Sequence, residues 1–411
     1  MSIATEKSSA RGIRQSAERV NAALHKVVNQ IPIPSRTPKD LARRLKIHRT
    51  LASRLLGALR MSDPLAVVTN IPGKQGLETI LRAAESIVGS ESAGEARLAL
   101  DEFENIVEHG LGGREVLDVA MGAWLPEMRE KQELACKQQV YRGLCGLAGA
   151  SADVTVDMAI RYPSDDGERA NLVMVQGLIG LRRLSPGKDI QIGTLGMIPG
   201  VTTPSGAVIQ NLPGSSEPDG PPIIEEFSSS PLPPIREIRL GNYRQYLLSG
   251  EEIGNRSKVD IFTGVVVRNI APLYRPKSSP PRRTGAAQMI EVPTKTLLMD
   301  FFVQEQALPL NSWQLMVHRT GQRGGVDPND PIREMDRLEC TDSIQYLGRG
   351  PERFGALEVA RYPAIVRYVC DKLDLDSSQL IGHRCRVQYP LPHVQYSMGF
   401  ELPTRDEGSG G

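Results

Sequence analysis

The chain has 411 residues, of which 40% are hydrophobic, 24% are charged and 5% are aromatic. This length predicts two or three domains, the composition is that of a soluble globular protein, and the few aromatics argue against a surface that stacks nucleic-acid bases. Five scattered cysteines without a CxxC pair argue against a disulfide framework, and no apolar stretch suits a secretion signal or the roughly 18–20 residues of a membrane span. We therefore expect a cytoplasmic protein without a membrane partner.

The formal net charge of +1 hides a strong asymmetry along the chain. Residues 1–60 carry 13 Lys and Arg against 3 Asp and Glu, residues 61–137 carry 7 against 14, and residues 138–411 carry 29 against 31. The net charges of the three segments are therefore +10, −7 and −2. Positive charge at one end suits contact with phosphates, because neutralising phosphates releases counterions and supplies most non-specific affinity for DNA. The alternative is a basic arm that only aids solubility.

The first 36 residues are predicted to form a basic arm and a leading helix. Residues 1–16 are rich in Ser and Arg, and we expect them to be mobile. Residues 17–30 place apolar side chains at helical spacing, which predicts a helix that ends before the prolines that follow.

Residues 37–62 have the pattern of two short helices joined by a tight turn. Thr37 is a favourable N-cap and Pro38 suits the first helical position, so a helix is predicted as far as Leu45. A second helix is predicted from Arg49 to about Leu59. Its apolar positions recur at three and four residues and predict one buried stripe, formed by Ala52, Leu55, Leu56 and Leu59.

The segment LARRLKIHRTLASRLL is similar to the core pattern of bacterial helix-turn-helix DNA-binding regulators. In those proteins a Leu-Ala pair, a turn and a second helix of the type SRxL recur, and Ser53, Arg54 and Leu56 match that helix. Lys46 stands where many such turns carry Gly, which predicts a positive φ. His48 stands where a Ser or Thr cap is usual, so Thr50 could cap a later start. The resemblance covers residues 37–60, and a plain αα-hairpin with solvated basic faces is the alternative.

The resemblance implies that the second helix lies in the major groove of double-stranded DNA. Its exposed side chains would then read base edges, namely Arg49, Thr50, Ser53 and Arg54. The phosphate contacts would come from Arg43, Arg44, Lys46 and Arg60.

Residues 63–150 are predicted to form an acidic helical block that packs on the helix-turn-helix. Apolar side chains at i, i+3, i+4 and i+7 predict helices over 76–88 and 94–109, and one or two more over 114–140. Their apolar stripe exceeds what a small module needs to bury; it comprises Leu77, Ile80, Leu81, Ala84, Ile87, Val88, Phe103, Ile106 and Val107. We therefore expect a homodimer or higher oligomer. The alternative is that the whole stripe is intramolecular core.

Residues 151–403 change to the pattern of an α+β domain that is mostly antiparallel, so the fold class is multidomain, an all-α module followed by an α+β domain. Alternating residues over 151–162 predict a half-buried strand, further strands follow, and residues 355–375 have a helical period. The Pro-rich stretches 199–235 and 272–285 are predicted to be irregular loops, and the tail 404–411 to be disordered. Four cations of the second loop could touch a nucleic-acid backbone or simply be solvated, namely Arg275, Lys277, Arg282 and Arg283.

The sequence contains no convincing catalytic or metal site. Gly180–Lys188 has the wrong spacing for a phosphate-binding loop. His383, Cys385 and His393 lack the second Cys/His pair that a four-ligand zinc site needs, and Cys385 is expected to be a buried hydrophobe. A Cys–His nucleophile pair formed in space stays open. We expect no cofactor, no metal and no enzymatic activity.

Two functions from different classes fit these observations. The first is a cytoplasmic, bacterial transcription regulator that binds double-stranded DNA and carries a C-terminal ligand-sensing or self-association domain. The second is a structural or interaction protein that self-assembles through its C-terminal domain, with the basic N-terminal end as an adaptor.

Overall fold

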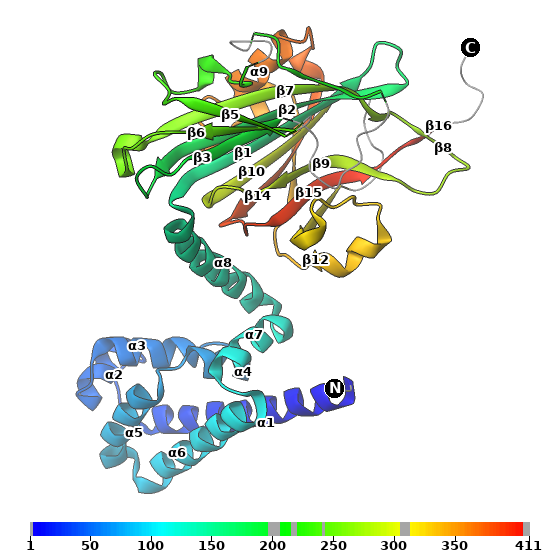
Figure 1. Ribbon diagram of the computed structural model, residues 1–411. Helices are drawn as coiled ribbons and strands as arrows, with labels where there is room; N and C mark the ends of the chain where they lie inside the picture. The colour runs from blue at the N-terminus through cyan, green and yellow to red at the C-terminus, as the bar shows by residue number, and fades with distance from the viewer. Residues whose placement is uncertain (1–2, 196–205, 215–219, 241–242, 305–312, 406–411) are drawn as a thin grey trace. The chain divides into compact units, whose positions relative to one another are not determined.

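The computed structural model describes residues 3–195, 206–214, 220–240, 243–304 and 313–405 (Figure 1). The chain forms two compact units, residues 1–133 and 134–411. The first is helical and the second is an α+β unit whose sheets are mostly antiparallel, which confirms the expected fold class. Among the helices of the described residues, none has the length and hydropathy that a membrane span requires.

The helices of the first unit follow one another with short connections. They are α1 (Ile3–Gln30), α2 (Pro38–Leu45), α3 (Arg49–Ala58), α4 (Pro64–Asn70), α5 (Lys74–Val88), α6 (Ser90–Asn105) and α7 (Arg114–Trp124). A π-helical turn over Ile106–Leu111 separates α6 from α7, where the sequence predicted that the helix would continue to residue 109. α8 (Pro126–Ala148) begins in this unit and continues into the second.

The leading helix is longer than predicted. α1 begins at Ile3, so residues 3–16, which were expected to lack regular structure before the leading helix, are helical. Ile13 and Ala17 are buried and continue the stripe of Val20 and Leu24 at spacings of three and four residues. This stripe packs in the core of the helical unit, where α1 lies against α4 and α6. The spacing of apolar residues was therefore a better predictor of the start of this helix than the Ser and Arg content of its first turns.

The apolar stripe of the acidic block lies largely inside the helical unit. Leu77, Ile80 and Leu81 of α5 and Phe103 of α6 are buried in one core together with side chains of α1, α2 and α3. These residues are intramolecular core, so they are not available for the dimer interface that the sequence suggested.

The second unit consists mainly of strands. Its elements are β1 (Ala150–Pro163), β2 (Arg169–Arg183), β3 (Ile190–Leu195), β4 (Val208–Asn211), β5 (Ile235–Leu240), β6 (Tyr243–Leu248), β7 (Val259–Pro272), β8 (Arg275–Pro276), β9 (Arg283–Met289), β10 (Thr294–Gln304), β11 (Gln314–Arg319), β12 (Arg337–Leu338), β13 (Ile344–Arg349), α9 (Tyr362–Asp371), β14 (Leu380–Gln388), β15 (Val394–Glu401) and β16 (Thr404–Arg405).

The described strands form four sheets, of which the largest has seven strands in the order β13-β14-β10-β1-β2-β7-β4. Within it β1 and β10 run parallel, and the other neighbours are antiparallel. The smaller sheets have the orders β12-β11-β15-β9, β3-β6-β5 and β16-β8. Near the middle of the large sheet, Asp157 of β1 lies between Met299 of β10 and Gln176 of β2.

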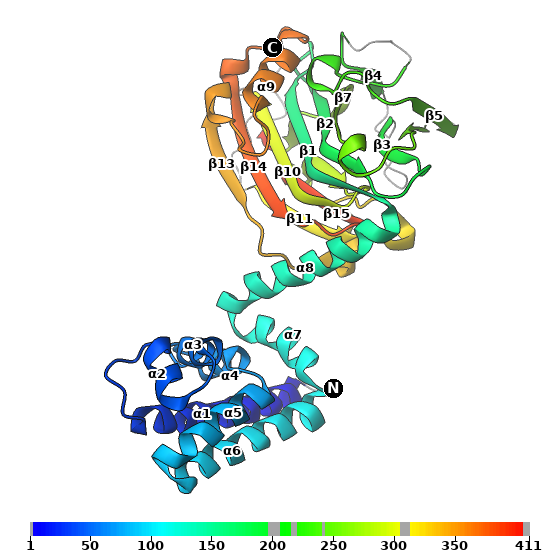
Figure 2. The ribbon, with the colours of Figure 1, turned by 90° about the vertical axis from the view of Figure 1, so that its left-hand side faces the viewer.

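The seven-stranded sheet is covered on both faces (Figure 2). On one face, Val156 and Met158 of β1 pack in the same apolar core as Ile365 of α9. On the other face, Phe301 of β10 packs with Tyr396 of β15, a strand of the four-stranded sheet. The strand predicted over 151–162 is therefore buried on both faces and not half-buried.

Several segments predicted to be irregular contain short strands. β4 lies within the Pro-rich stretch 199–235, β8 and the start of β9 lie within 272–285, and β16 lies at the start of the tail 404–411. The helix predicted from residue 355 begins later, because α9 starts at Tyr362 with a proline in its first turn. Strand pairing with β7, β15 and β16 gives these Pro-rich segments their order, and no local residue pattern announces it.

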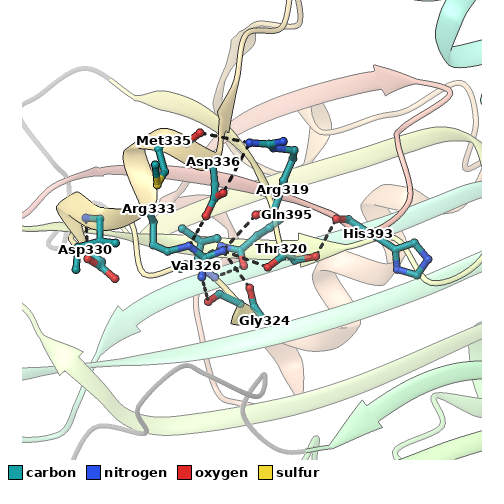
Figure 3. Close-up of polar contacts among 12 residues, drawn as sticks. Arg319, Thr320, Gly324, Val326, Asp330, Arg333, Met335, Asp336, His393 and Gln395 are labelled. Atoms are coloured by element: carbon teal, nitrogen blue, oxygen red, sulfur yellow. Dashed lines mark hydrogen bonds and ion pairs between the residues drawn. The ribbon is translucent and has the colours of Figure 1, made fainter. Parts of the chain in front are cut away.

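A buried arginine organises the segment between β11 and β12 (Figure 3). Arg333 donates a hydrogen bond to the carbonyl oxygen of Gly325 at 3.2 Å and pairs with the Asp336 carboxylate at 2.8 Å. Gln395 of β15 donates to the backbone carbonyl of Val326 and accepts from its N–H, both at 2.8 Å. These hydrogen bonds hold the segment between β11 and β12 against the four-stranded sheet.

Candidate nucleic-acid interface

The first helix of the predicted helix-turn-helix begins with a reciprocal cap. The Thr37 hydroxyl accepts from the backbone N–H of Asp40 at 3.2 Å and donates to the Asp40 carboxylate at 2.7 Å. The Ser35 hydroxyl donates to the same carboxylate at 2.6 Å. The hydrogen bonds from Ser35 and then Thr37 lower the pKa of Asp40. The only acidic residue of the segment 37–60 is thus engaged in holding the start of α2.

The turn between α2 and α3 has the positive φ that the sequence predicted. Lys46 is left-handed, with φ 55° and ψ 40°. The N–H groups of Lys46 and Ile47 both donate to the carbonyl of Ala42, the second at 3.1 Å, which is the hydrogen bonding of a Schellman-type helix end. Ile47 is half-buried and packs on the core of the helical unit. The turn therefore tolerates a lysine where glycine is more usual.

The second helix begins at Arg49 as predicted, but its cap differs from the expected one. Nδ1 of His48 accepts a hydrogen bond from the N–H of Thr50 at 3.3 Å, so the imidazole does the work of a Ser or Thr hydroxyl. Thr50 itself does not cap a later start. The predicted stripe of α3, which includes Leu55, is buried.

All eight residues predicted to contact DNA are exposed, namely Arg43, Arg44, Lys46, Arg49, Thr50, Ser53, Arg54 and Arg60. Thr50, Ser53 and Arg54 lie on one face of α3, because residues three and four apart are neighbours on a helix. Gly57 continues that face, and a Cβ added there would meet nothing within 4 Å. The face that the motif assigns to base reading is thus open.

The basic charges of residues 1–60 fall into two groups. In α1, three cations pair with an acid within 3.1 Å: Arg14 with Asp63, Arg19 with Glu102 and Lys26 with Glu95. For the cations of α2 and α3, the ion pair found within the described ranges is a long one, 3.8 Å, from Arg43 to Asp40. Residues 37–60 hold seven Lys and Arg against one Asp, a net charge of +6. Acidic neighbours offset the charge of α1 but largely not that of the helix-turn-helix.

Arg60 is held differently from the other predicted phosphate contacts. Its Nη2 donates to the backbone carbonyl of Arg36 at 3.3 Å, which ties the end of α3 to the segment that precedes α2. Arg60 therefore has a structural contact within the helical unit as well as an exposed side chain.

The other stretches considered in the sequence do not form a phosphate-binding, nucleophilic or metal site among the described residues. Gly180 lies within β2, so the stretch 180–188 is not a loop that opens a helix. His383 stacks on Trp313 with ring centroids 4.2 Å apart, and burial lowers its pKa to about 4. Burial raises the pKa of the Cys385 thiol to about 12. His383 is thus a weak base and Cys385 a protonated thiol, so the two do not form a reactive nucleophile pair. The described residues contain no group of His, Cys, Asp and Glu that could hold a metal.

The basic loop 272–285 is only partly solvated. Arg275 forms an ion pair with Glu401 at 2.8 Å, and the backbone N–H of Arg283 donates to the Asn329 side chain at 2.7 Å. Arg282 is exposed. These contacts favour a structural role for Arg275 over contact with a nucleic-acid backbone.

The α+β unit contains a buried polar row that was not predicted from the sequence. Strand register places Asp157 of β1, Gln176 of β2 and Thr263 of β7 side by side, on the face from which Gln176 donates to Gln288 of β9 at 2.7 Å. Asp157 and Thr263 are 4% and 6% exposed, and no other described residue is hydrogen-bonded to either side chain. Burial, with a smaller effect of a nearby carboxylate, raises the pKa of Asp157 to about 7. The signal available was the alternation of β1, whose polar positions were assigned to solvent.

No family model and no curated protein matches the chain. Among solved structures, it is distantly similar to a protein from Parabacteroides distasonis described as a "putative protease", with 6% sequence identity and a TM-score of 0.28. The match covers 61% of this chain and 40% of that chain, less than half of its length. A similarity this distant indicates neither a shared fold nor a shared activity.

Proposed function

We propose that the helical unit binds double-stranded DNA with α3 in the major groove. The chain would then act as a transcription regulator whose α+β unit senses a ligand or mediates self-association. The observation that carries the proposal is the net charge of +6 over residues 37–60, since three of the five cations of α1 are paired internally and those of α2 and α3 largely are not. Phosphates are the partners that such a surface fits best.

The exposed face of α3 suits base reading. Arg54 carries a guanidinium that can donate two hydrogen bonds to the O6 and N7 atoms of a guanine, and Thr50 and Ser53 offer shorter hydroxyl contacts. Gly57 leaves room for close approach to the groove. Arg44 and Lys46 flank this face in sequence and supply charge for phosphates.

The test uses the full-length chain and duplexes selected from a randomised DNA pool, with mobility shifts over a range of salt concentrations. Arg54→Ala should weaken binding to the selected duplex by about 1–3 kcal/mol, with little change on random DNA. Arg44→Ala should weaken both equally and lower the slope of log affinity against log salt by about 1.

The matched control is Arg256→Ala, which removes an exposed cation from the α+β unit and should change neither affinity. Equal losses for Arg54→Ala and Arg256→Ala, or no binding at low salt, would show that the DNA proposal is wrong. Absence of binding together with concentration-dependent assembly would favour the structural protein. Such a protein could pair through strands at the edges of the large sheet, such as β4 and β13.

A further inference from the structure

A cavity of about 130 Å³ lies within the α+β unit. Side chains of β1, β2 and β7 form one side of it, and β3 and the end of β9 form the other. An engineered protein cavity of about 150 Å³ holds a benzene molecule, so this cavity has room for one compact molecule of similar size.

Two residues of the buried polar row, Gln176 and Thr263, line one side of the cavity, whereas Asp157 is not part of the lining. Thr263 lines it, and so does Thr155, the next inward residue of β1, which is 5% exposed and has no partner for its hydroxyl oxygen. Gln176 uses its amide N–H₂ on Gln288 and keeps its carbonyl oxygen as an acceptor. Buried polar groups in native proteins are almost always hydrogen-bonded. Polar groups left unpartnered at the wall of a cavity are those that a polar ligand would satisfy.

The charge of the lining narrows the class of ligand. Within the described ranges no Lys or Arg lines the cavity, and its one ionisable lining residue is the acidic Glu291. Anions are usually held by cations, so this lining disfavours an anionic ligand. Gln191 and Thr194 of β3 add further neutral donors and acceptors, while Ile192 and Val265 supply apolar surface. The lining thus combines hydroxyl groups, carboxamide groups and the Glu291 carboxyl with apolar patches that suit C–H bonds.

We propose that this cavity binds a small, neutral, polyhydroxylated molecule, either a polyol or a single sugar ring. Several hydroxyl groups on one compact frame both donate and accept hydrogen bonds, as the polar row requires. Binding at this cavity does not depend on the DNA-binding role, and it gives the proposed sensing function of the α+β unit a site and a ligand class.

The test titrates D-xylose into the full-length chain in a calorimeter. We expect saturable binding that Thr263→Val weakens about three- to tenfold, because valine keeps the shape of threonine and lacks the hydroxyl. Thr296→Val on β10 makes the same change at a buried threonine outside the cavity lining and should leave the affinity unchanged.

Gly193→Leu is a second variant. A Cβ at Gly193 would lie 3.8 Å from the Thr263 hydroxyl oxygen, so a larger side chain fills the cavity and should abolish binding. The proposal would be overturned if cyclohexanol bound with the same affinity as xylose, or if D-xylose 5-phosphate bound more tightly than xylose. An unchanged affinity for xylose in both cavity variants would overturn it as well. Xylose that binds without altering the DNA mobility shift would leave the cavity proposal standing and remove the sensing role.

Discussion

Asp157 lies in the middle of the seven-stranded sheet with its pKa raised from 3.8 to about 7, chiefly by burial. Between about pH 4 and 7 the folded state therefore binds one more proton at this site than the unfolded state. The free energy of unfolding should fall as the pH rises through this range, by up to about 1.4 kcal/mol per pH unit. We expect Asp157→Asn to remove that loss, so its gain in stability over the wild type should grow from pH 4 to pH 7 in urea unfolding experiments.

His383 changes the free energy of unfolding with pH in the opposite direction and therefore serves as the internal control. Burial lowers its pKa from 6.5 to about 4, so over this range the folded state binds fewer protons and its stability falls as the pH falls. The two slopes oppose each other in the wild type. In Asp157→Asn only the contribution of His383 to the pH dependence remains, so the free energy of unfolding of this variant should rise from pH 4 to 6.5. Parallel curves for wild type and variant over pH 4–7 would mean that Asp157 titrates normally.

Residues whose roles depend on neighbours a few positions away were predictable from the sequence. Thr37 as a cap and the buried stripe of α3 follow from local sequence and were confirmed. The positive φ of Lys46 was implied by the resemblance to helix-turn-helix regulators and was also confirmed. His48 as the cap of α3 was missed, because an imidazole can accept a hydrogen bond only in one tautomer and orientation. The polar row of Asp157 and Thr263 depends on strand register across the sheet, which no local pattern contains.

At the scale of elements, β10 and β14 are joined by a buried ion pair. Arg384 donates from Nε and Nη2 to the two carboxylate oxygens of Asp300 at 2.8 and 2.6 Å, and to the carbonyls of Phe354 and Gly355 at 2.8 and 2.6 Å. Arg384→Met removes the cation that pairs with the buried Asp300 carboxylate. We expect it to lower the free energy of unfolding by about 3–5 kcal/mol, measured by urea denaturation.

The double variant Asp300→Leu with Arg384→Met should recover most of that loss, since it buries no uncompensated charge. The surface control is Arg236→Met, because Arg236 is exposed and pairs with the half-buried Asp189, so this change should cost less than about 1 kcal/mol. Similar losses for the two single variants would contradict the argument that burial gives the pair between β10 and β14 its importance.

The errors at this scale share one cause. The strand over 151–162 was predicted to be half-buried because polar residues alternate with apolar ones, yet the four-stranded sheet covers the polar positions as well. α1 was predicted to start too late because its first turns are rich in Ser and Arg. In both cases distant segments decide burial, whereas α5, with its clean apolar period, needed no such information.

At the scale of the whole molecule, the helical unit uses its own acidic residues to pair three of the five cations of α1. The excess positive charge of residues 1–60 was visible in the sequence, but which cations are paired was not. The ion pairs between α1 and α6 join positions about 70 to 80 residues apart. This difference supports the DNA proposal, because the cations of residues 37–60 are largely unpaired and those of α1 are mostly paired.

The last prediction is that the chain is a dimer in solution. One recognition helix covers only a few base pairs, and helix-turn-helix proteins gain specificity by pairing half-sites roughly 34–36 Å apart. The stripe of α5 is core, but Val116 and Val119 of α7 are 45% and 69% exposed and lie three residues apart on one helix face. Light scattering at micromolar concentration should give a mass about twice 45.0 kDa. Val119→Glu should lower it, Leu98→Glu on α6 should not, and a wild-type mass near 45.0 kDa that stays unchanged with DNA would rule the dimer out.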